Sequence, residues 1–252
     1  MKNVNDIIWL DNVDSTNEEA KRRFHICDNL SVLSALSQSS GRGQMGNVWL
    51  SESGSNLTFS IILKLDEGPM SRIQAYDQFA VCEIAALAVS DYLNSHDIPA
   101  MIKWPNDIYV NDKKICGILI ENRIRGEWLS GSIIGIGLNV NQETFDASLP
   151  NPTSMCLETS RKYDIQECLE DFMHIFKEYH DRYLNIKGGL NRLRTLYLAQ
   201  MWHKGEPHRY RAEGNEFTGI IRGLSPIGHL VVEDIEKGEL KEFAFKEISY
   251  IL

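Results

Sequence analysis

The sequence lacks the features of a secreted protein, of a membrane-spanning protein and of a protein stabilised by a structural metal ion. Its five cysteines are scattered, with no Cys-x-x-Cys pair, so neither a disulfide framework nor a zinc site is predicted. No apolar run approaches the length of a transmembrane helix, and the polar start Met1–Asp6 does not resemble a signal peptide. Repeats and low-complexity segments are also absent. These absences predict reduced thiols, a cytoplasmic location and no membrane partner.

Positive charge is scarce as well. The 252 residues include 26 lysines and arginines against 35 aspartates and glutamates, which gives a formal net charge of −9. An acidic chain is repelled by the phosphate backbone of nucleic acids, so no broad nucleic-acid surface is expected, whereas a local basic site is compatible with this charge. The length allows a sizeable core in one large domain or in two unequal domains.

The most informative stretch is a glycine-rich run from Gln38 to Trp49, QSSGRGQMGNVW. Glycine lets a backbone turn tightly and approach a ligand, and successive N–H groups in such a loop suit phosphate or carboxylate oxygens. Arg42 adds a planar cation, and Trp49 adds a flat apolar face on which a base could stack. A plain surface loop is the alternative interpretation. A P-loop is excluded because the Gly-Lys-Ser/Thr ending is missing.

Hydrophobic periodicity predicts a mixed domain of strands and helices in the larger part of the chain. Strands are expected at residues 7–10, 32–36, 56–65, 101–110, 114–121 and 131–140. Helices are expected over residues 71–96, 164–186 and 190–202. A further helix is expected to begin at Ser15, which forms a capping box with Glu18. Gly135 and Gly137 indicate that a ligand or a packed helix approaches the last strand closely.

The pattern changes after Lys204-Gly205. Short strand candidates separated by glycine, proline and asparagine follow at residues 208–211, 217–224, 228–233, 239–243 and 248–252. Such a series is typical of a small all-β barrel appended to a mixed domain.

Five motifs occur in order: Asp14-Ser-Thr-Asn17, the glycine-rich run, Lys103-Trp-Pro-Asn-Asp107, Lys114-Ile-Cys-Gly-Ile-Leu119 and Gly135-Ile-Gly-Leu-Asn139. Together they resemble the biotin protein ligases. The resemblance implies an α+β fold, with a catalytic domain like that of class II aminoacyl-tRNA synthetases over residues 1–202, built on a mixed sheet flanked by helices. It also implies an SH3-like β-barrel over residues 203–252.

The reaction that the resemblance implies has two steps. The carboxylate of biotin attacks the α-phosphate of ATP, in the presence of Mg²⁺, to give biotinyl-5′-AMP, which then acylates a lysine of a biotin carboxyl carrier domain. The implied partner is therefore this domain of a biotin-dependent carboxylase, and a homodimer through a sheet edge is a further option. The short segment before Asp14 is not expected to build the DNA-binding domain that some relatives carry, so no nucleic-acid partner is expected.

The resemblance also implies the residues of the site. Lys114 and Arg42 would be catalytic, because cations offset the repulsion between a carboxylate and a triphosphate, and Asp107 would hold the metal. The implied biotin-binding residues are Ser15, Thr16, Asn17, Gln38, Gly41, Arg42, Gly43, Gln44, Lys114 and Gly117. Those for ATP and the adenylate are Trp49, Asn106, Lys114 and Asn139.

Two other functions are compatible with parts of the sequence. A lipoate ligase or octanoyltransferase has a related fold, and the transferases use a cysteine. A regular strand would place Lys114, Cys116 and Ile118 on one face, so Cys116 is a candidate nucleophile. A non-catalytic binding protein or repressor is opposed by the acidic charge. One position departs from the family pattern: Gln44 stands where many relatives have arginine, which leaves the loop less cationic.

Overall fold

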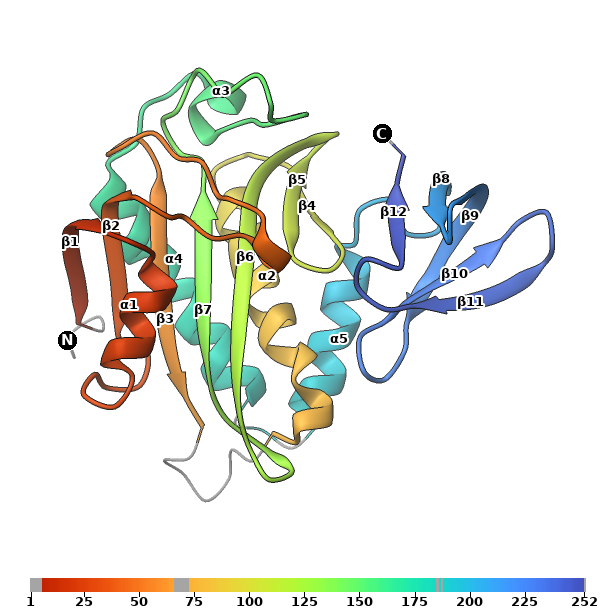
Figure 1. Cartoon of the computed structure of the whole chain (residues 1–252), viewed down its shortest axis with the longest axis horizontal. Helices are drawn as coiled ribbons and strands as arrows, with labels where there is room; N and C mark the ends of the chain where they lie inside the picture. Colours follow the sequence, from red (N-terminus) through yellow and green to blue (C-terminus); the bar gives the residue numbers. More distant parts are fainter. Residues whose placement is uncertain (1–5, 66–72, 185, 187, 252) are drawn as a thin grey trace.

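The computed structural model describes residues 6–65, 73–184, 186 and 188–251, which form two sheets and their covering helices (Figure 1). The predicted helix start at Ser71 and the predicted strand end at Leu252 lie outside the described residues.

The larger sheet has seven strands in the order β1-β2-β3-β7-β6-β5-β4. β1 pairs with β2 in parallel, and every other neighbouring pair is antiparallel, so the predicted mixed sheet is confirmed. The strands are β1 (Ile7–Val13), β2 (Val32–Gln38), β3 (Leu57–Lys64), β4 (Ala100–Lys103), β5 (Asp107–Val110), β6 (Lys113–Arg125) and β7 (Trp128–Leu138).

Helices cover both faces of this sheet (Figure 1). One face carries the main core beneath α2 (Phe79–Asn94) and α4 (Ile165–Tyr179), and 13 of the 16 residues of α2 are buried because it lies between the sheet and other helices. The other face carries a small cluster under α1 (Thr16–Arg23). The remaining helical segments are α3 (Met155–Thr159), α5 (Gly189–Ala199), the 3₁₀ turns η1 (Gln44–Gly46) and η2 (Ala75–Asp77), and the π turn η3 (His180–Leu184).

Three local predictions are wrong. The helix expected from residue 71 begins only at Phe79, after Gln74 has formed a β-bridge with Trp128. The strand expected over 101–110 is two antiparallel strands, β4 and β5, because the chain reverses at a cis Trp104–Pro105 peptide and Lys103 pairs with Asp107.

The capping box at the start of α1 is the third. Ser15 occupies the N-cap position, but its side chain makes no capping hydrogen bond. The Glu18 side chain forms ion pairs with Lys21 and Arg42 instead of returning to the helix start. Ion pairs with residues outside the first turn thus replace the local reciprocal bonds of a capping box.

The C-terminal residues form a separate five-stranded antiparallel sheet, which confirms the expected small β domain. Its strands, in the spatial order β11-β10-β9-β8-β12, are β8 (Pro207–Ala212), β9 (Asn215–Leu224), β10 (Leu230–Asp234), β11 (Glu239–Phe243) and β12 (Ile248–Tyr250). The predicted boundary at residues 202 and 203 lies in the turn before β8. Trp104 Nε1 donates a hydrogen bond to Gly228 O at 2.9 Å, so the loop between β4 and β5 is in direct contact with the loop between β9 and β10.

Candidate active site

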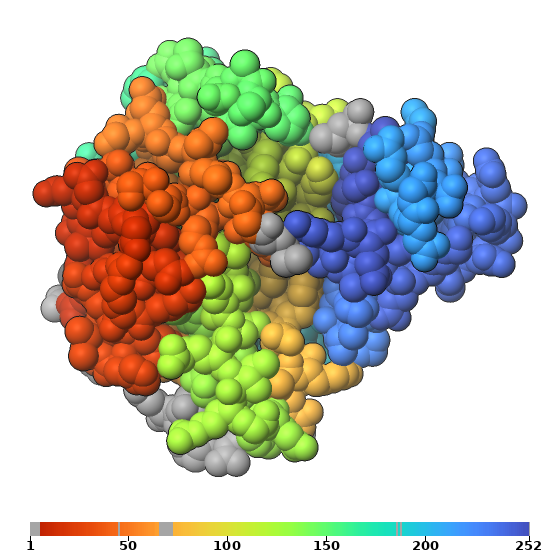
Figure 2. Space-filling model, in the orientation of Figure 1, coloured from red at the N-terminus to blue at the C-terminus, as the bar shows by residue number. Residues whose placement is uncertain are grey.

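A pocket of about 490 Å³ lies between the larger sheet, the glycine-rich loop and the C-terminal sheet. Figure 2 shows two sides of its mouth, the loop in orange and the C-terminal sheet in blue. Most of the residues implied by the sequence motifs line this pocket: Ser15, Thr16, Asn17, Gln38, Arg42, Gly43, Gln44, Trp49, Asn106, Asp107, Lys114 and Gly117. Gly41 and Asn139 do not.

The glycine-rich loop is a closed hairpin. Trp49 N donates to Gly41 O at 3.0 Å, Gly43 N donates to Asn47 O at 2.7 Å, and η1 forms the tip. A Cβ atom on Gly41 would lie 2.4 Å from Trp49 O. Gly41 is therefore needed for the close approach of the loop to itself.

Two glycines of β7 accommodate side chains from elsewhere in the chain. A Cβ on Gly135 would lie 2.2 Å from Asn17 Oδ1. A Cβ on Gly137 would lie 2.3 Å from Trp49 Cε2, and one on Gly117 would lie 3.0 Å from Trp49 Cζ3. The bare backbone thus forms a floor on which the indole rests. Trp49 Nε1 is buried without a hydrogen-bond partner among the described residues, so it is a donor that a ligand could satisfy.

The polar end of the pocket is a linked set of amide and hydroxyl groups. Gln38 Oε1 accepts a hydrogen bond from Thr16 N at 2.8 Å. Ser60 Oγ lies 2.8 Å from Thr16 Oγ1 and 2.6 Å from Asn17 Oδ1, and it is fully buried. Ser60 was not predicted as a site residue, because it occurs in a mainly apolar strand. These groups can hold a small polar head of a ligand in a fixed orientation.

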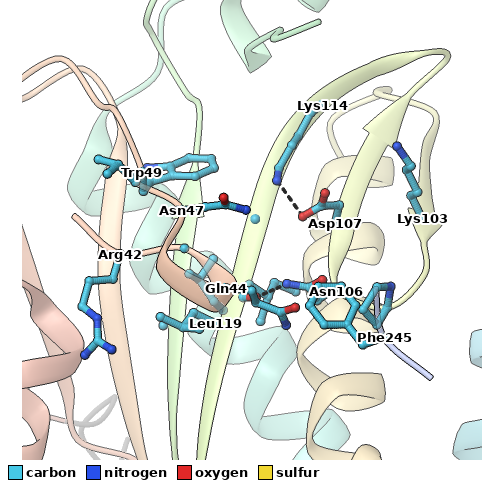
Figure 3. A pocket seen from close by; sticks show the side chains of 18 of the residues that line it. Arg42, Gln44, Asn47, Trp49, Lys103, Asn106, Asp107, Lys114, Leu119 and Phe245 are labelled. Carbon is cyan, nitrogen blue, oxygen red and sulfur yellow. Dashed lines mark hydrogen bonds and ion pairs between the residues drawn. The ribbon is translucent and has the colours of Figure 1, made fainter. Parts of the chain in front are cut away.

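Lys114 lies at the centre of the pocket, where its Nζ pairs with Asp107 Oδ1 at 2.7 Å (Figure 3). A β-bulge produces this placement: Tyr109 pairs with Lys114 and Ile108 pairs with Cys116, which leaves Ile115 without a partner on β5. The extra residue turns the Lys114 side chain towards Gly117, whose added Cβ would lie 3.4 Å from Lys114 Nζ.

Lys114 and Cys116 were predicted to lie on one face of a regular strand. Because of the bulge they do not, so this prediction is wrong. Cys116 is fully buried in the main core and does not line the pocket. Burial raises the pKa of its thiol, which disfavours the thiolate that a nucleophile requires. The structure therefore excludes Cys116 as a nucleophile in this pocket.

Arg42 lines the pocket, but its guanidinium is not directed at Lys114 (Figure 3). It forms an ion pair with Glu18 and lies 3.8 Å from Glu121 Oε1. Asn139 lies outside the pocket lining, where its Nδ2 donates to Thr153 O at 2.9 Å and its buried Oδ1 has no partner among the described residues.

Two contributions to the pocket were missed from the sequence. Lys103 lines it with Nζ 2.9 Å from Tyr109 Oη and 5.0 Å from the centre of the Tyr250 ring. Burial lowers the pKa of Lys103 to about 8, with Lys114 acting in the same direction and Asp107 opposing it. The second contribution that was missed is the β12 region of the C-terminal sheet. Asn47 of the glycine-rich loop also lines the pocket and was not predicted to do so. The lining residues of that region are Phe245, Lys246, Ile248, Ser249 and Tyr250. Only the tertiary structure brings this region to the motifs.

Asp107 is the single carboxylate among the described residues that line the pocket. Across the described part of the chain, no group of three or more His, Cys, Asp or Glu side chains is arranged to hold a metal ion. A metal held mainly by protein side chains is therefore not supported. One carboxylate does suit Mg²⁺ when phosphates supply most of the other ligands.

Comparisons with known proteins point to one family. The profile of the Biotin/lipoate A/B protein ligase family matches residues 9–139. The chain is 29% identical over 229 residues to a biotin–[acetyl-CoA-carboxylase] ligase of Paracoccus denitrificans, which covers 87% of this chain and 90% of that protein. It is 31% identical over 205 residues to a bifunctional ligase/repressor BirA of Bacillus subtilis, which covers 79% of this chain. The match spans only 60% of that longer relative.

A solved structure agrees with the sequence comparisons. The fold is similar to that of a biotin protein ligase from Aquifex aeolicus in complex with biotin and ATP, with a TM-score of 0.76, 29% identity and 97% of each chain covered. In the part of the chain that the structure describes, no helix is both long enough and apolar enough to cross a membrane.

Proposed function

We propose, from the premise that the chain belongs to the Biotin/lipoate A/B protein ligase family, that it is a biotin protein ligase. It uses ATP to activate biotin as biotinyl-5′-AMP and then transfers the biotinyl group to a lysine of a biotin carboxyl carrier domain. The observation that carries the proposal is that Lys114, the polar groups around Thr16 and the indole of Trp49 line one pocket.

The three parts of the pocket suit the three parts of the reactants. Ser15, Thr16, Asn17 and Gln38 hold the ureido head of biotin, whose carboxylate then reaches Lys114. The adenine lies at Trp49, near Asn106. The unpartnered, buried Trp49 Nε1 supports a polar ligand in this region. The adenylate-binding role of Asn139 requires a rearrangement, because its side chain lies outside the lining.

In the first step a carboxylate oxygen of biotin forms a bond to the α-phosphorus of ATP. The bond from that phosphorus to the oxygen of the β-phosphate breaks, and pyrophosphate leaves with the electron pair. Two anions must meet for this to happen, and Lys114 places a positive charge between them. Lys103 supplies a second cation on the same wall.

Mg²⁺ bound to the phosphates supplies further positive charge to the transition state. Asp107 is the residue that would hold it, which fits the chemistry of a single carboxylate beside phosphate ligands. Asp107 is paired with Lys114 in this structure, so both would turn towards the nucleotide when it binds.

In the second step the neutral amine of the acceptor lysine attacks the carbonyl carbon of the adenylate. The amide bond forms, the bond from that carbon to the phosphate oxygen breaks, AMP leaves with the electron pair, and the amine nitrogen gives one proton to the solvent. The acceptor is a carrier domain of a biotin-dependent carboxylase. A homodimer would form through an edge of the larger sheet, and β1 is one of its two edge strands among the described residues.

The test is exchange of labelled pyrophosphate into ATP, followed by mass spectrometry of a carrier domain after incubation with biotin and MgATP. Exchange that depends on biotin, together with a biotinyl mass increase, supports the proposal. Exchange that depends on lipoate or octanoate instead would assign the other activity of the family. Absence of exchange with all three acids, together with a gel shift of DNA, would favour a non-catalytic repressor.

A further inference from the structure

The guanidinium of Arg42 has carboxylate partners on two elements outside the loop. Nη1 forms an ion pair with Glu18 of α1 and lies 3.8 Å from Glu121 Oε1 of β6. In Figure 3 the side chain extends away from Lys114 and Trp49. The cation that the loop would offer to biotin and ATP is thus paired with protein anions in this structure.

Lys21 also pairs with both carboxylates, so they keep a cationic partner when Arg42 moves away. Its Nζ lies 2.8 Å from Glu18 Oε1 and 2.7 Å from Glu121 Oε1. The cluster therefore holds two carboxylates and two cations. If Arg42 leaves, each carboxylate keeps one cationic partner, and Glu121 also keeps the hydrogen bond from Asn17 Nδ2 at 3.0 Å. Departure of Arg42 leaves no carboxylate unpaired, so it does not incur the large cost of an isolated charge.

We propose that Glu18 is a positioning residue that holds the Arg42 guanidinium away from Lys114 until the anionic groups of the substrates displace Glu18. This inference rests on the proposed function, because it requires a carboxylate and phosphates as the competing anions. Glu121 and Lys21 are the other two members of this cluster of charged side chains. With Arg42 gone the cluster has a net charge of −1, which favours the return of Arg42 after the products leave.

The ion pair between Arg42 and Glu18 is weak enough for the anionic groups of the substrates to replace Glu18 reversibly. The side chains of Arg42 and Glu18 are 45% and 32% exposed, so solvent screens their attraction and the pair is weak. A weak competitor reduces the fraction of molecules with a free Arg42 by roughly two- to fivefold, and the apparent affinity for the substrates falls by the same factor. Hydrogen bonds from Arg42 to a phosphate or carboxylate in the closed pocket are stronger and displace Glu18.

The experiment compares Glu18→Gln with the matched control Glu19→Gln. Both variants remove one carboxylate from α1, but Glu19 pairs with Arg22 and Arg23 on its own helix and not with Arg42. Glu18→Gln is expected to lower KM for biotin and for ATP by about two- to fivefold in pyrophosphate exchange, with little change in kcat. Lys21→Gln is expected to act in the opposite direction, because both carboxylates would then have only Arg42.

Trypsin provides a readout that does not depend on activity, since it must bind the Arg42 side chain to cleave the Arg42–Gly43 bond. In the ligand-free protein, cleavage is expected to be about two- to fivefold faster in Glu18→Gln than in wild type or Glu19→Gln, and slower in Lys21→Gln. Equal cleavage rates in all four proteins would overturn the inference, as would a KM for biotin that does not distinguish Glu18→Gln from Glu19→Gln. If wild type shows no biotin-dependent exchange, the proposed function fails, and the cleavage rates still decide whether Glu18 holds Arg42.

Discussion

The indole of Trp49 lies directly on the backbone of Gly137, where a Cβ atom would come within 2.3 Å of Trp49 Cε2. Gly137→Ala should therefore displace the indole and weaken the surface on which the adenine stacks. We expect KM for ATP in pyrophosphate exchange to rise by up to about tenfold, the scale of one aromatic stacking contact. Gly223→Ala is the control, because a Cβ at that strand position meets nothing within 4 Å. An unchanged KM and unchanged tryptophan fluorescence would contradict the predicted displacement.

Lys114→Ala should leave the fold intact and remove the positive charge between biotin and ATP. Loss of one preorganised electrostatic donor costs about 2–4 kcal/mol of transition-state stabilisation, so kcat/KM should fall by roughly 30- to 1,000-fold. Lys113→Ala is the matched control, because the neighbouring lysine is exposed and does not line the pocket. Near-normal biotin-dependent exchange by folded Lys114→Ala would remove Lys114 from the mechanism.

Gln44 lines the pocket with Oε1 buried and without a hydrogen-bond partner among the described residues. An arginine there would add a charged, forked donor near the phosphate of the adenylate, and a charge-assisted hydrogen bond is about twice as strong as a neutral one. Gln44→Arg should therefore slow the escape of biotinyl-5′-AMP in a stopped-flow measurement. Ser39→Arg, at an exposed position, controls for the added charge. The prediction is wrong if both variants release the adenylate as fast as wild type.

Glu83 makes the stability of the protein depend on pH. It is 1% exposed in α2 and pairs with Arg194, and burial raises its pKa to about 7 although Arg194 acts in the opposite direction. The unfolded chain releases this proton near its ordinary pKa of 4.5, whereas the folded protein retains it up to about pH 7. The folded state thus binds more protons in this window, and the free energy of unfolding should fall as pH rises through it.

The size of this effect follows from about 1.4 kcal/mol for each pKa unit, so a loss of roughly 2–3 kcal/mol is expected between pH 4.5 and 7. Urea unfolding of wild type and Glu83→Gln at several pH values isolates this contribution, because the variant should lack the slope. Glu170→Gln, an exposed position of α4, should keep the wild-type slope. Parallel pH profiles for wild type and Glu83→Gln would contradict the assignment.

The sequence by itself determined the fold class and most of the residues that meet in the pocket. Strand and helix periods come from local alternation of apolar and polar residues, which is why the buried stretch 56–65 was recognised as the region of β3. The motifs are recognised from residue type and order alone, so they identify candidate site residues along the chain. The structure brings three of these residues, Thr16, Trp49 and Lys114, into one cavity. Chemistry that depends on residue type and order was therefore predictable.

Tertiary structure decided what local pattern does not specify. The β-bulge at Ile115 depends on pairing with β5, so the sequence could not separate Lys114 from Cys116. The carboxylates that hold Arg42 lie 24 and 79 positions away along the chain, and only packing of α1 against β6 and β7 brings them to the loop. The β12 region reaches the pocket for the same reason. Register and long-range contacts are set by how whole elements pack, so the direction of each side chain was fixed by the fold and not by its own neighbours in sequence.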